Sequence, residues 1–166
     1  GVAQCWRDHY DRLHLHTVKE LSHLPGEDFP EDFDRYVHKK DLVKYYENYA
    51  QKRGIEPLFG KTVTAIEKEN DVWTVTCSDD SSYSSPHVII CAGMNRIPFR
   101  PHFQNEDDFA GEIIHSHDYQ NPAPYNGKRV LVVGMGNSGA EIALDLCEKD
   151  VETYISVRGP VNIVPR

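Results

Sequence analysis

A glycine-rich loop between a short apolar run and an amphipathic segment constrains this chain most. Residues 130–133 read Val-Leu-Val-Val and residues 134–139 read Gly-Met-Gly-Asn-Ser-Gly. The segment that follows, to Lys149, carries apolar side chains at helical spacing, namely Ala140, Ala143, Leu144 and Cys147. The order strand, GxGxxG and helix predicts the opening of a βαβ unit that binds a dinucleotide. The alternative is a glycine-rich turn without a ligand.

Each glycine of this loop has an expected role in binding. Gly134 permits the tight turn, Gly136 lets the backbone approach the pyrophosphate, and Gly139 allows the helix to pack closely. The unpaired N–H groups of the helix N-terminus, which includes Asn137 and Ser138, supply partial positive charge to the phosphates. We therefore assign residues 134 and 136–139 to cofactor binding.

The end of the next strand, predicted at residues 152–157, indicates which dinucleotide binds. A carboxylate there accepts hydrogen bonds from the adenosine ribose, whereas a cation accommodates a 2′-phosphate. This sequence has Ser156 and Arg158 at that point. A hydroxyl donor beside a guanidinium favours NADP(H) over NAD(H). A solvated surface arginine is the alternative.

A second apolar run, residues 88–93, reads Val-Ile-Ile-Cys-Ala-Gly and is typical of a strand buried on both faces of a parallel sheet. Two β-rich runs precede it, Lys61–Ile66 and Val72–Ser78, and a charged turn at 67–71 separates them. With a third short run near Tyr83, they predict an antiparallel meander.

The other segments are a helix and two connections. Apolar positions recur at spacings of three and four over residues 40–53, and Gly54 follows as a stop, so this segment is predicted to be a helix with one buried face. Residues 1–37 indicate an irregular, partly buried connection. Residues 95–127 hold four of the ten prolines, which predicts an interdomain connection with a boundary near Ile97.

Composition excludes several classes of function. The chain has 18 Lys plus Arg against 26 Asp plus Glu, a net charge of −8, which argues against a nucleic-acid partner. No apolar run approaches the roughly 18 to 20 residues of a membrane helix. Four scattered cysteines indicate neither a disulfide framework nor a zinc site, and a reducing cytosol is the simplest compartment. The pairs His14/His16 and His115/His117 lack a further ligand at a matching spacing, so no metal site is predicted.

Just upstream of the glycine loop, the side chains Phe109, Gly111, His115 and Tyr119 have the spacing FxGxxxHxxxY. This pattern resembles the fingerprint of flavin-containing monooxygenases. Cys91-Ala92-Gly93 resembles the ATG-type strand end of that family, and the segment from Trp6 to Lys44 resembles the long connection after its first flavin-binding unit. A final Tyr in place of Trp is closer to these enzymes, including the plant-type branch that makes auxin, than to Baeyer-Villiger monooxygenases.

The resemblance implies FAD and NADPH as cofactors, and O2 with a small organic substrate as reactants. Hydride passes from NADPH to FAD, reduced flavin reacts with O2, and one oxygen atom is inserted into the substrate. The residues implied to lie at the flavin are Trp6, His16, Cys91, Ala92 and Gly93. His16 stands where many family members have Asn, so the catalytic role of that Asn is not transferred and no catalytic residue is assigned. His115 and Tyr119 are expected to hold the linker and orient the two domains.

The expected fold is α/β, a fragment of a Rossmann-like flavoprotein with two dinucleotide-binding domains and a β-meander. Residues 1–97 correspond to a partial FAD-binding domain that lacks its first βαβ unit, and residues 98–166 to the linker and the opening βαβ of the NADPH-binding domain. The first flavin-binding GxGxxG is expected upstream of Gly1, so the isolated chain is expected to be inactive and to leave residues 88–92 without sheet neighbours.

Other functions stay open at this stage. The chain could be a catalytically incomplete nucleotide-binding fragment or belong to a Baeyer-Villiger-type monooxygenase. A disulfide reductase of the same architecture needs a redox-active Cys pair, and no CxxC occurs here. A nucleophilic nitrogen or sulfur, a ketone and a 2-oxo acid all remain as substrate classes.

Overall fold

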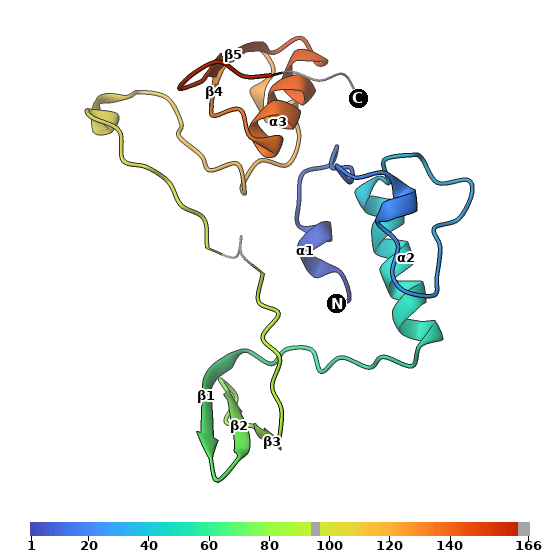
Figure 1. Ribbon diagram of the computed structural model, residues 1–166. Coiled ribbons are helices and arrows are strands. Elements are labelled where there is room, and N and C mark those ends of the chain that lie inside the picture. The colour runs from blue at the N-terminus through green and yellow to red at the C-terminus, as the bar shows by residue number, and fades with distance from the viewer. Residues whose placement is uncertain (94–96, 163–166) are drawn as a thin grey trace.

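The computed structural model describes residues 1–93 and 97–162 (Figure 1). The helices are α1 (Gln4–Arg7), α2 (Lys39–Lys52) and α3 (Asn137–Cys147), and the strands are β1 (Val63–Glu69), β2 (Val72–Cys77), β3 (Ser82–Ser85), β4 (Arg129–Val133) and β5 (Glu152–Ser156). Three short 3-10 helices, at Lys19–Leu21, Glu106–Asp108 and Ala123–Tyr125, lie in the connections. In Figure 1, β1, β2 and β3 lie together at one end, apart from the helices and from β4 and β5.

Helix α2 confirms the helix predicted at residues 40–53. His38 caps its N-terminus, because the His38 ring accepts a hydrogen bond from the Lys40 N–H, and Gly54 follows its end with a φ of +61°. The buried face carries Leu42 and Tyr45, which pack with Phe29 and Val37. The predicted irregular connection before α2 is also confirmed, and it contains the single turn of α1.

The meander forms as predicted, but its first turn is shorter than the sequence indicated. Strand β1 pairs with β2 as far as the register Glu69↔Val72, so the turn consists of Asn70 and Asp71 alone and the predicted turn at 67–71 is wrong. Both turn residues have positive φ, which matches the twist of a two-residue hairpin and lets residues 67–69 remain in the ladder. Strand β3 completes the sheet, with Val75 opposite Tyr83.

The glycine-rich segment folds into the predicted βαβ unit. Strands β4 and β5 pair in parallel from Arg129↔Glu152 to Val133↔Ser156, and α3 connects them. One core cluster joins this unit to the N-terminal segment and to the linker; its buried members are Tyr10, Leu13, Tyr119, Ile142, Leu146 and Val151.

Only some of the apolar positions noted in the sequence lie on the buried face of α3. Ile142, Ala143 and Leu146 are buried, whereas Leu144 and Cys147 are exposed. Since 3.6 residues complete a turn, Leu144 lies about 200° around the helix from Ile142 and from Leu146, and it therefore faces solvent.

The second apolar run does not form the predicted strand. Residues 88–93 belong to neither sheet, and Ile89 and Ile90 are 87% and 72% exposed. A buried parallel strand needs neighbours on both sides and covered faces, and none of the described strands pairs with this run. The expectation that this run lacks sheet neighbours is therefore met within the described residues.

The predicted proline-rich connection is irregular from residue 97 to residue 127, with two 3-10 turns. Asn95, where that prediction begins, lies outside the described residues. Within residues 1–93 and 97–162, no helix is long and apolar enough to span a membrane.

Candidate functional site

The loop between β4 and α3 has the backbone geometry that the glycine pattern predicts. Gly134 has a φ of +105°, in the region that favours glycine, and its N–H donates to the carbonyl oxygen of Ser156 at 2.9 Å. This bond joins the start of the loop to the end of β5. The turn glycine therefore brings the loop and the tip of β5, two of the predicted binding elements, together.

The other two glycines differ in the space around them. A Cβ on Gly139 would lie 2.3 Å from the carbonyl oxygen of Gly134, so the helix packs against the loop at a distance that no other residue permits. A Cβ on Gly136 would meet no atom within 4 Å. The space at Gly136 is open toward whatever approaches the loop, while Gly139 closes the loop onto the helix.

The N-terminus of α3 can accept an anion. Gly136 is its N-cap, and no side chain caps the helix. The first intrahelical bond runs from the Ala140 N–H to the Gly136 carbonyl oxygen, so the preceding amides, Asn137, Ser138 and Gly139, have no partner in the helix. Unpaired amides and the positive end of the helix dipole together suit a phosphate group.

Ser156 is the last residue of β5, and Arg158 follows two residues later; both side chains are exposed. Because Gly134 is bonded to Ser156, the hydroxyl and the loop share one edge of the sheet. The arrangement can bind the pyrophosphate at the loop and a charged group at the end of β5.

The residues assigned to flavin lie in three different surroundings. Trp6 is half-buried and packs against both core clusters. His16 is exposed. Residues 91–93 are exposed, and Gly93 has a φ of +75°. The structure thus brings the glycine loop and Ser156 together, whereas the residues assigned to flavin differ in burial.

The fingerprint residues take separate roles. Tyr119 is buried, and its hydroxyl donates to Asp145 Oδ2 of α3 at 2.7 Å. His115 accepts a hydrogen bond from the His117 N–H at 3.0 Å and so shapes the turn before Tyr119. Phe109 covers Gly111, where a Cβ would lie 2.4 Å from the phenyl ring. Phe109 and His115 therefore make local contacts in the linker, whereas Tyr119 bonds the linker to α3.

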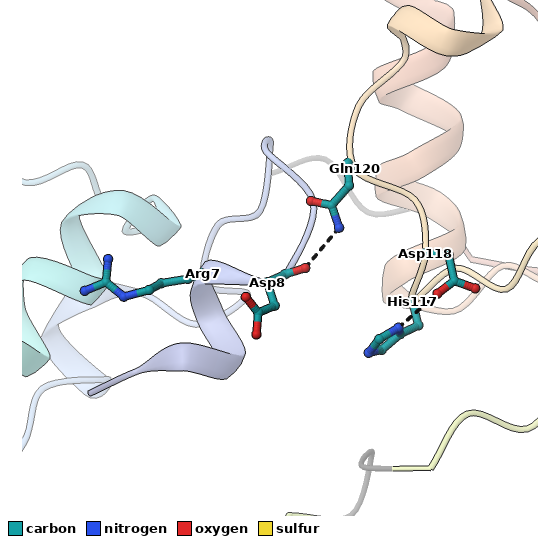
Figure 2. A pocket seen from close by; sticks show the side chains of 5 residues that line it. All are labelled: Arg7, Asp8, His117, Asp118 and Gln120. Carbon is teal, nitrogen blue, oxygen red and sulfur yellow. Dashed lines mark hydrogen bonds and ion pairs between the residues drawn. The ribbon is translucent and has the colours of Figure 1, made fainter. Parts of the chain in front are cut away.

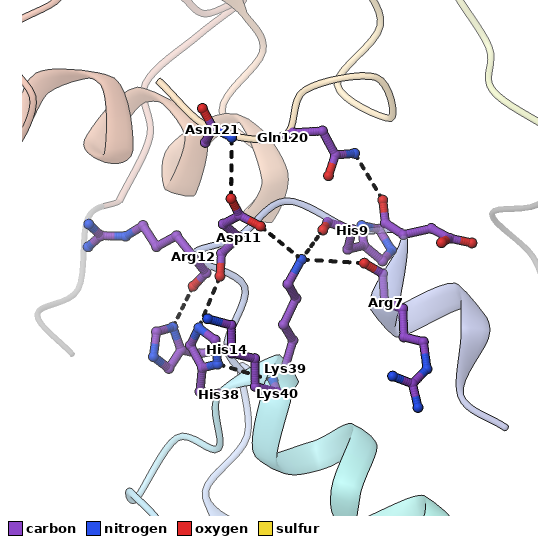
Figure 3. Close-up of polar contacts among 11 residues, drawn as sticks. Arg7, His9, Asp11, Arg12, His14, His38, Lys39, Lys40, Gln120 and Asn121 are labelled. Carbon is purple, nitrogen blue, oxygen red and sulfur yellow. Dashed lines mark hydrogen bonds and ion pairs between the residues drawn. The ribbon is translucent and has the colours of Figure 1, made fainter. Parts of the chain in front are cut away.

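Sequence reasoning missed a polar contact between the N-terminal segment and the rest of the molecule (Figure 3). Lys39 is buried, and its Nζ donates to the carbonyl oxygens of Arg7 and His9 and approaches Asp11 Oδ1 at 3.4 Å. The other carboxylate oxygen of Asp11 accepts from Asn121 at 3.3 Å. A lysine on the buried face of a helix was the available signal, because buried lysines need a partner.

A hollow of about 540 Å³ lies where α1 and the linker meet. Figure 2 shows the side chains that line it. Its lining residues are Arg7, Asp8, His117, Asp118 and Gln120. Gln120 Nε2 donates to the Asp8 carbonyl oxygen at 3.0 Å, and His117 Nδ1 lies 3.2 Å from Asp118 Oδ1. The hollow thus carries charges of both signs. Across residues 1–93 and 97–162, no three His, Cys, Asp or Glu side chains gather in a way that could hold a metal ion.

A βαβ unit with this glycine loop, preceded by a linker whose tyrosine packs into the unit, defines a dinucleotide-binding protein of the Rossmann type. The chain also matches the model of the FMO-like family, described as flavin-binding monooxygenase-like, over residues 4–166. It therefore belongs to this family, and the resemblance stated from the sequence is confirmed.

Known relatives place the chain within longer proteins. It is 40% identical to the indole-3-pyruvate monooxygenase YUCCA8 of rice, Oryza sativa subsp. indica, over 100% of this chain and 42% of the relative. It is 38% identical to the indole-3-pyruvate monooxygenase YUCCA6 of Arabidopsis thaliana, of which it covers 42%. The chain thus spans less than half the length of these curated relatives.

Solved structures agree with the fold. The flavin-containing monooxygenase of Stenotrophomonas maltophilia superposes with a TM-score of 0.82 at 29% identity, over 90% of this chain and 45% of that one. Cyclohexanone monooxygenase, at 24% identity and a TM-score of 0.74, shares the fold. The predicted fold class, α/β and corresponding to part of a flavoprotein with two dinucleotide-binding domains, is confirmed.

Proposed function

We propose that this chain serves an FAD- and NADPH-dependent monooxygenase, which inserts one oxygen atom of O2 into a small organic substrate. The observation that carries the proposal is the glycine loop of residues 134–139, which sits at the tip of β5 in the geometry of a dinucleotide site, in a chain of the flavin-binding monooxygenase family. Residues 1–97 are assigned to the flavin domain and residues 98–166 to the linker and the start of the NADPH domain. The proposed compartment is the cytoplasm.

The residues of the loop fit NADPH. The open space at Gly136 admits the pyrophosphate, and the amides of Asn137, Ser138 and Gly139 donate to it. Arg158 pairs with the 2′-phosphate, and the Ser156 hydroxyl donates beside it. NADPH supplies the hydride when it is bound, and the work of these residues is to bind and orient it.

The residues assigned to FAD have different surroundings. The family is flavin-binding, but Trp6 is half-buried against the core, His16 and residues 91–93 are exposed, and the chain covers less than half of its relatives. We assign Trp6, His16, Cys91, Ala92 and Gly93 to the flavin side of the whole protein and derive no chemical step from them.

Among the substrate classes left open by the sequence, we favour a 2-oxo acid. The relatives at 40% and 38% identity are named as indole-3-pyruvate monooxygenases, and indole-3-pyruvate is a 2-oxo acid. The neighbour named for cyclohexanone, a ketone, is only 24% identical. A 2-oxo acid with an aromatic side chain is therefore the first substrate to assay.

The cofactor assignment is tested by replacing Arg158 with Ala and measuring the affinity for NADPH and for NADH. Loss of a charge-assisted contact of roughly 1.5 to 3 kcal/mol should weaken NADPH binding about ten- to a hundredfold. NADH binding should not change, because NADH has no 2′-phosphate. Arg35→Ala, at another exposed arginine far along the chain, is the matched control. An equal loss for both dinucleotides would assign Arg158 to the fold.

One observation favours a second candidate, a nucleotide-binding chain without turnover of its own. Residues 88–93 belong to neither sheet, and residues 89–93 are exposed. The test is to purify the 166-residue chain, add FAD and follow NADPH-dependent oxygen uptake. NADPH binding without uptake supports this candidate for the isolated chain, whereas stoichiometric FAD binding with substrate-dependent NADPH oxidation excludes it.

A further inference from the structure

The buried carboxylate of Asp145 joins three segments that lie far apart in the sequence. It projects from α3, is 7% exposed, and accepts the hydrogen bond from the Tyr119 hydroxyl at 2.7 Å. Tyr119 stacks on Tyr125 with ring centroids 5.8 Å apart and lies 6.3 Å from the ring of Tyr10. Helix α3, the linker and the N-terminal segment therefore meet at this bond.

Arg12 adds a second link between the N-terminal segment and α3. Its guanidinium bonds to Glu148, and its Nε lies 3.5 Å from Glu141 Oε2. Burial, and then the hydrogen bond to Asp145, raise the pKa of Tyr119 far above its usual range, so the hydroxyl stays protonated as a donor. The contact therefore combines a buried neutral donor with charged partners at its rim.

Two further hydrogen bonds, one between backbone groups and one from a side chain, fix the N-terminal segment to the linker at the same place. The Asp11 N–H donates to the Gln120 carbonyl oxygen at 2.8 Å, and Gln120 Nε2 donates to the Asp8 carbonyl oxygen. Residue 120 directly follows Tyr119. The chain on either side of this attachment leads to the residues assigned to cofactors: Trp6 and His16 flank residues 8–13, while α3 begins at the glycine loop.

We propose that Asp145 is a positioning residue for hydride transfer: as the acceptor for Tyr119, it holds the glycine loop of α3 at a fixed place relative to the flavin-facing segment of residues 6–16. This inference rests on the proposed function. Asp145 is buried against Tyr119 and acts through that residue and the segment that packs on it. Hydride transfer depends steeply on the distance and angle between donor and acceptor, so a loose attachment slows that step with little effect on binding.

The experiment compares the whole FAD-loaded protein with four variants. Asp145→Leu removes the acceptor, Asp145→Asn keeps an oxygen that can accept, and Tyr119→Phe removes the donor while it keeps the ring. Tyr154→Phe is the matched control, because that tyrosine is exposed on β5 and its hydroxyl bonds to Glu152, outside this contact. Three quantities are measured: the rate of anaerobic flavin reduction at saturating NADPH, the Kd for NADP+, and amide hydrogen exchange in residues 8–13.

Asp145→Leu and Tyr119→Phe should slow flavin reduction by about tenfold or more, leave the Kd for NADP+ nearly unchanged, and speed exchange in residues 8–13. Asp145→Asn and Tyr154→Phe should behave like the unsubstituted protein. If Asp145→Leu fails to fold, Tyr119→Phe alone tests whether the hydrogen bond affects the rate of flavin reduction, because the phenyl ring keeps the packing.

Three results overturn the proposal: an unchanged reduction rate in Tyr119→Phe, a slowed rate without faster exchange in residues 8–13, or a loss in Asp145→Asn as large as in Asp145→Leu. Each would show that the hydrogen bond does not hold the two segments for transfer. If the unsubstituted protein neither binds NADP+ nor reduces its flavin, the proposed function fails and this proposal fails with it. If the unsubstituted protein reduces its flavin normally, any of the three results above counts against the role of Asp145 alone and leaves the proposed function standing.

Discussion

Two apolar runs of this chain have nearly the same sequence character and opposite structures. Residues 130–134 and residues 88–93 are both rich in Val and Ile or Leu, and both end in glycine. The first is strand β4 and pairs along its length with β5. The second belongs to neither sheet and exposes Ile89 and Ile90.

The two runs differ in their neighbouring strands and core contacts, because the backbone conformation at the end of each run is similar. Gly134 and Gly93 both have positive φ, at +105° and +75°. Val132 packs into a cluster that includes Leu146 and Val151, whereas the described part of the chain has no strand beside residues 88–93. Sequence sets the turn at the end of such a run, and the neighbouring strands decide whether its amides enter a ladder.

Matched truncations of one buried and one exposed apolar side chain test the difference between the two runs. Leu146→Ala removes a side chain that is 1% exposed and should lower the free energy of unfolding by about 2 to 5 kcal/mol. Ile90→Ala removes one that is 72% exposed and should change it by no more than about 0.5 kcal/mol. Denaturant unfolding of the 166-residue chain measures both. A comparable loss for Ile90 would mean that residues 88–93 are packed in solution, and the comparison would not hold.

Alanine substitutions test why the loop that follows β4 needs glycine. Gly139→Ala places a Cβ 2.3 Å from the Gly134 carbonyl oxygen, so the loop or the helix must shift, at a cost of about 1 to 3 kcal/mol. Gly136→Ala meets open space and should cost less than about 1 kcal/mol. Thermal unfolding of the two variants gives the order. Equal costs would indicate that close packing of α3 on the loop is not what requires glycine.

The same contrast explains how much could be predicted from the sequence. The βαβ unit was predictable because its strand, loop and helix are contiguous and its strand pairing lies within residues 129–156. Gly134, Gly139 and Ser156 accordingly fall where the motif placed them. The prediction of a buried strand at 88–93 was wrong because the apolar pattern indicates burial but carries no information on which strands are present. The expectation that the run lacks sheet neighbours came from the family resemblance and not from the pattern.

The contact at Asp145 could not be predicted for a different reason. An aspartate in a helix is normally expected to face solvent. Asp145 has a hydrogen-bond donor in the core only because Tyr119, which lies 26 residues earlier in the sequence, packs against α3. Leu144 is apolar and exposed, and the neighbouring Asp145 is the residue that faces inward. Long-range polar pairs of this kind are fixed by tertiary packing and have no local signature.

A fall in pH should weaken the N-terminal cap of α2 and leave α3 unchanged. The His38 ring caps α2 by accepting from the Lys40 N–H, and its Nε2 donates to the Asp11 carbonyl oxygen at 3.0 Å. Burial lowers the pKa of His38, and the nearby His14 and Lys40 lower it further, while the Asp11 carbonyl and Asp41 act in the opposite direction. Protonation would place a hydrogen on the nitrogen that accepts from Lys40, so the cap would be lost.

The pKa of His38 in the folded protein is below its ordinary value of 6.5, so as the pH falls through about that value the unfolded chain binds more protons than the folded chain. The cap therefore contributes its full free energy of unfolding, about 1 kcal/mol, above this pH. That contribution is lost as the pH falls toward the lower pKa of the folded state. His9, whose pKa is also lowered mainly by burial, adds to the decline in the same direction.

His38→Asn keeps a capping oxygen that does not titrate. The free energy of unfolding of this variant should therefore fall less between pH 7 and pH 5 than that of the unsubstituted chain. Helix α3, which begins at Gly136 without a side-chain cap, should keep its amide protection over this range, and equal loss in both helices would place the pH sensitivity elsewhere than at His38.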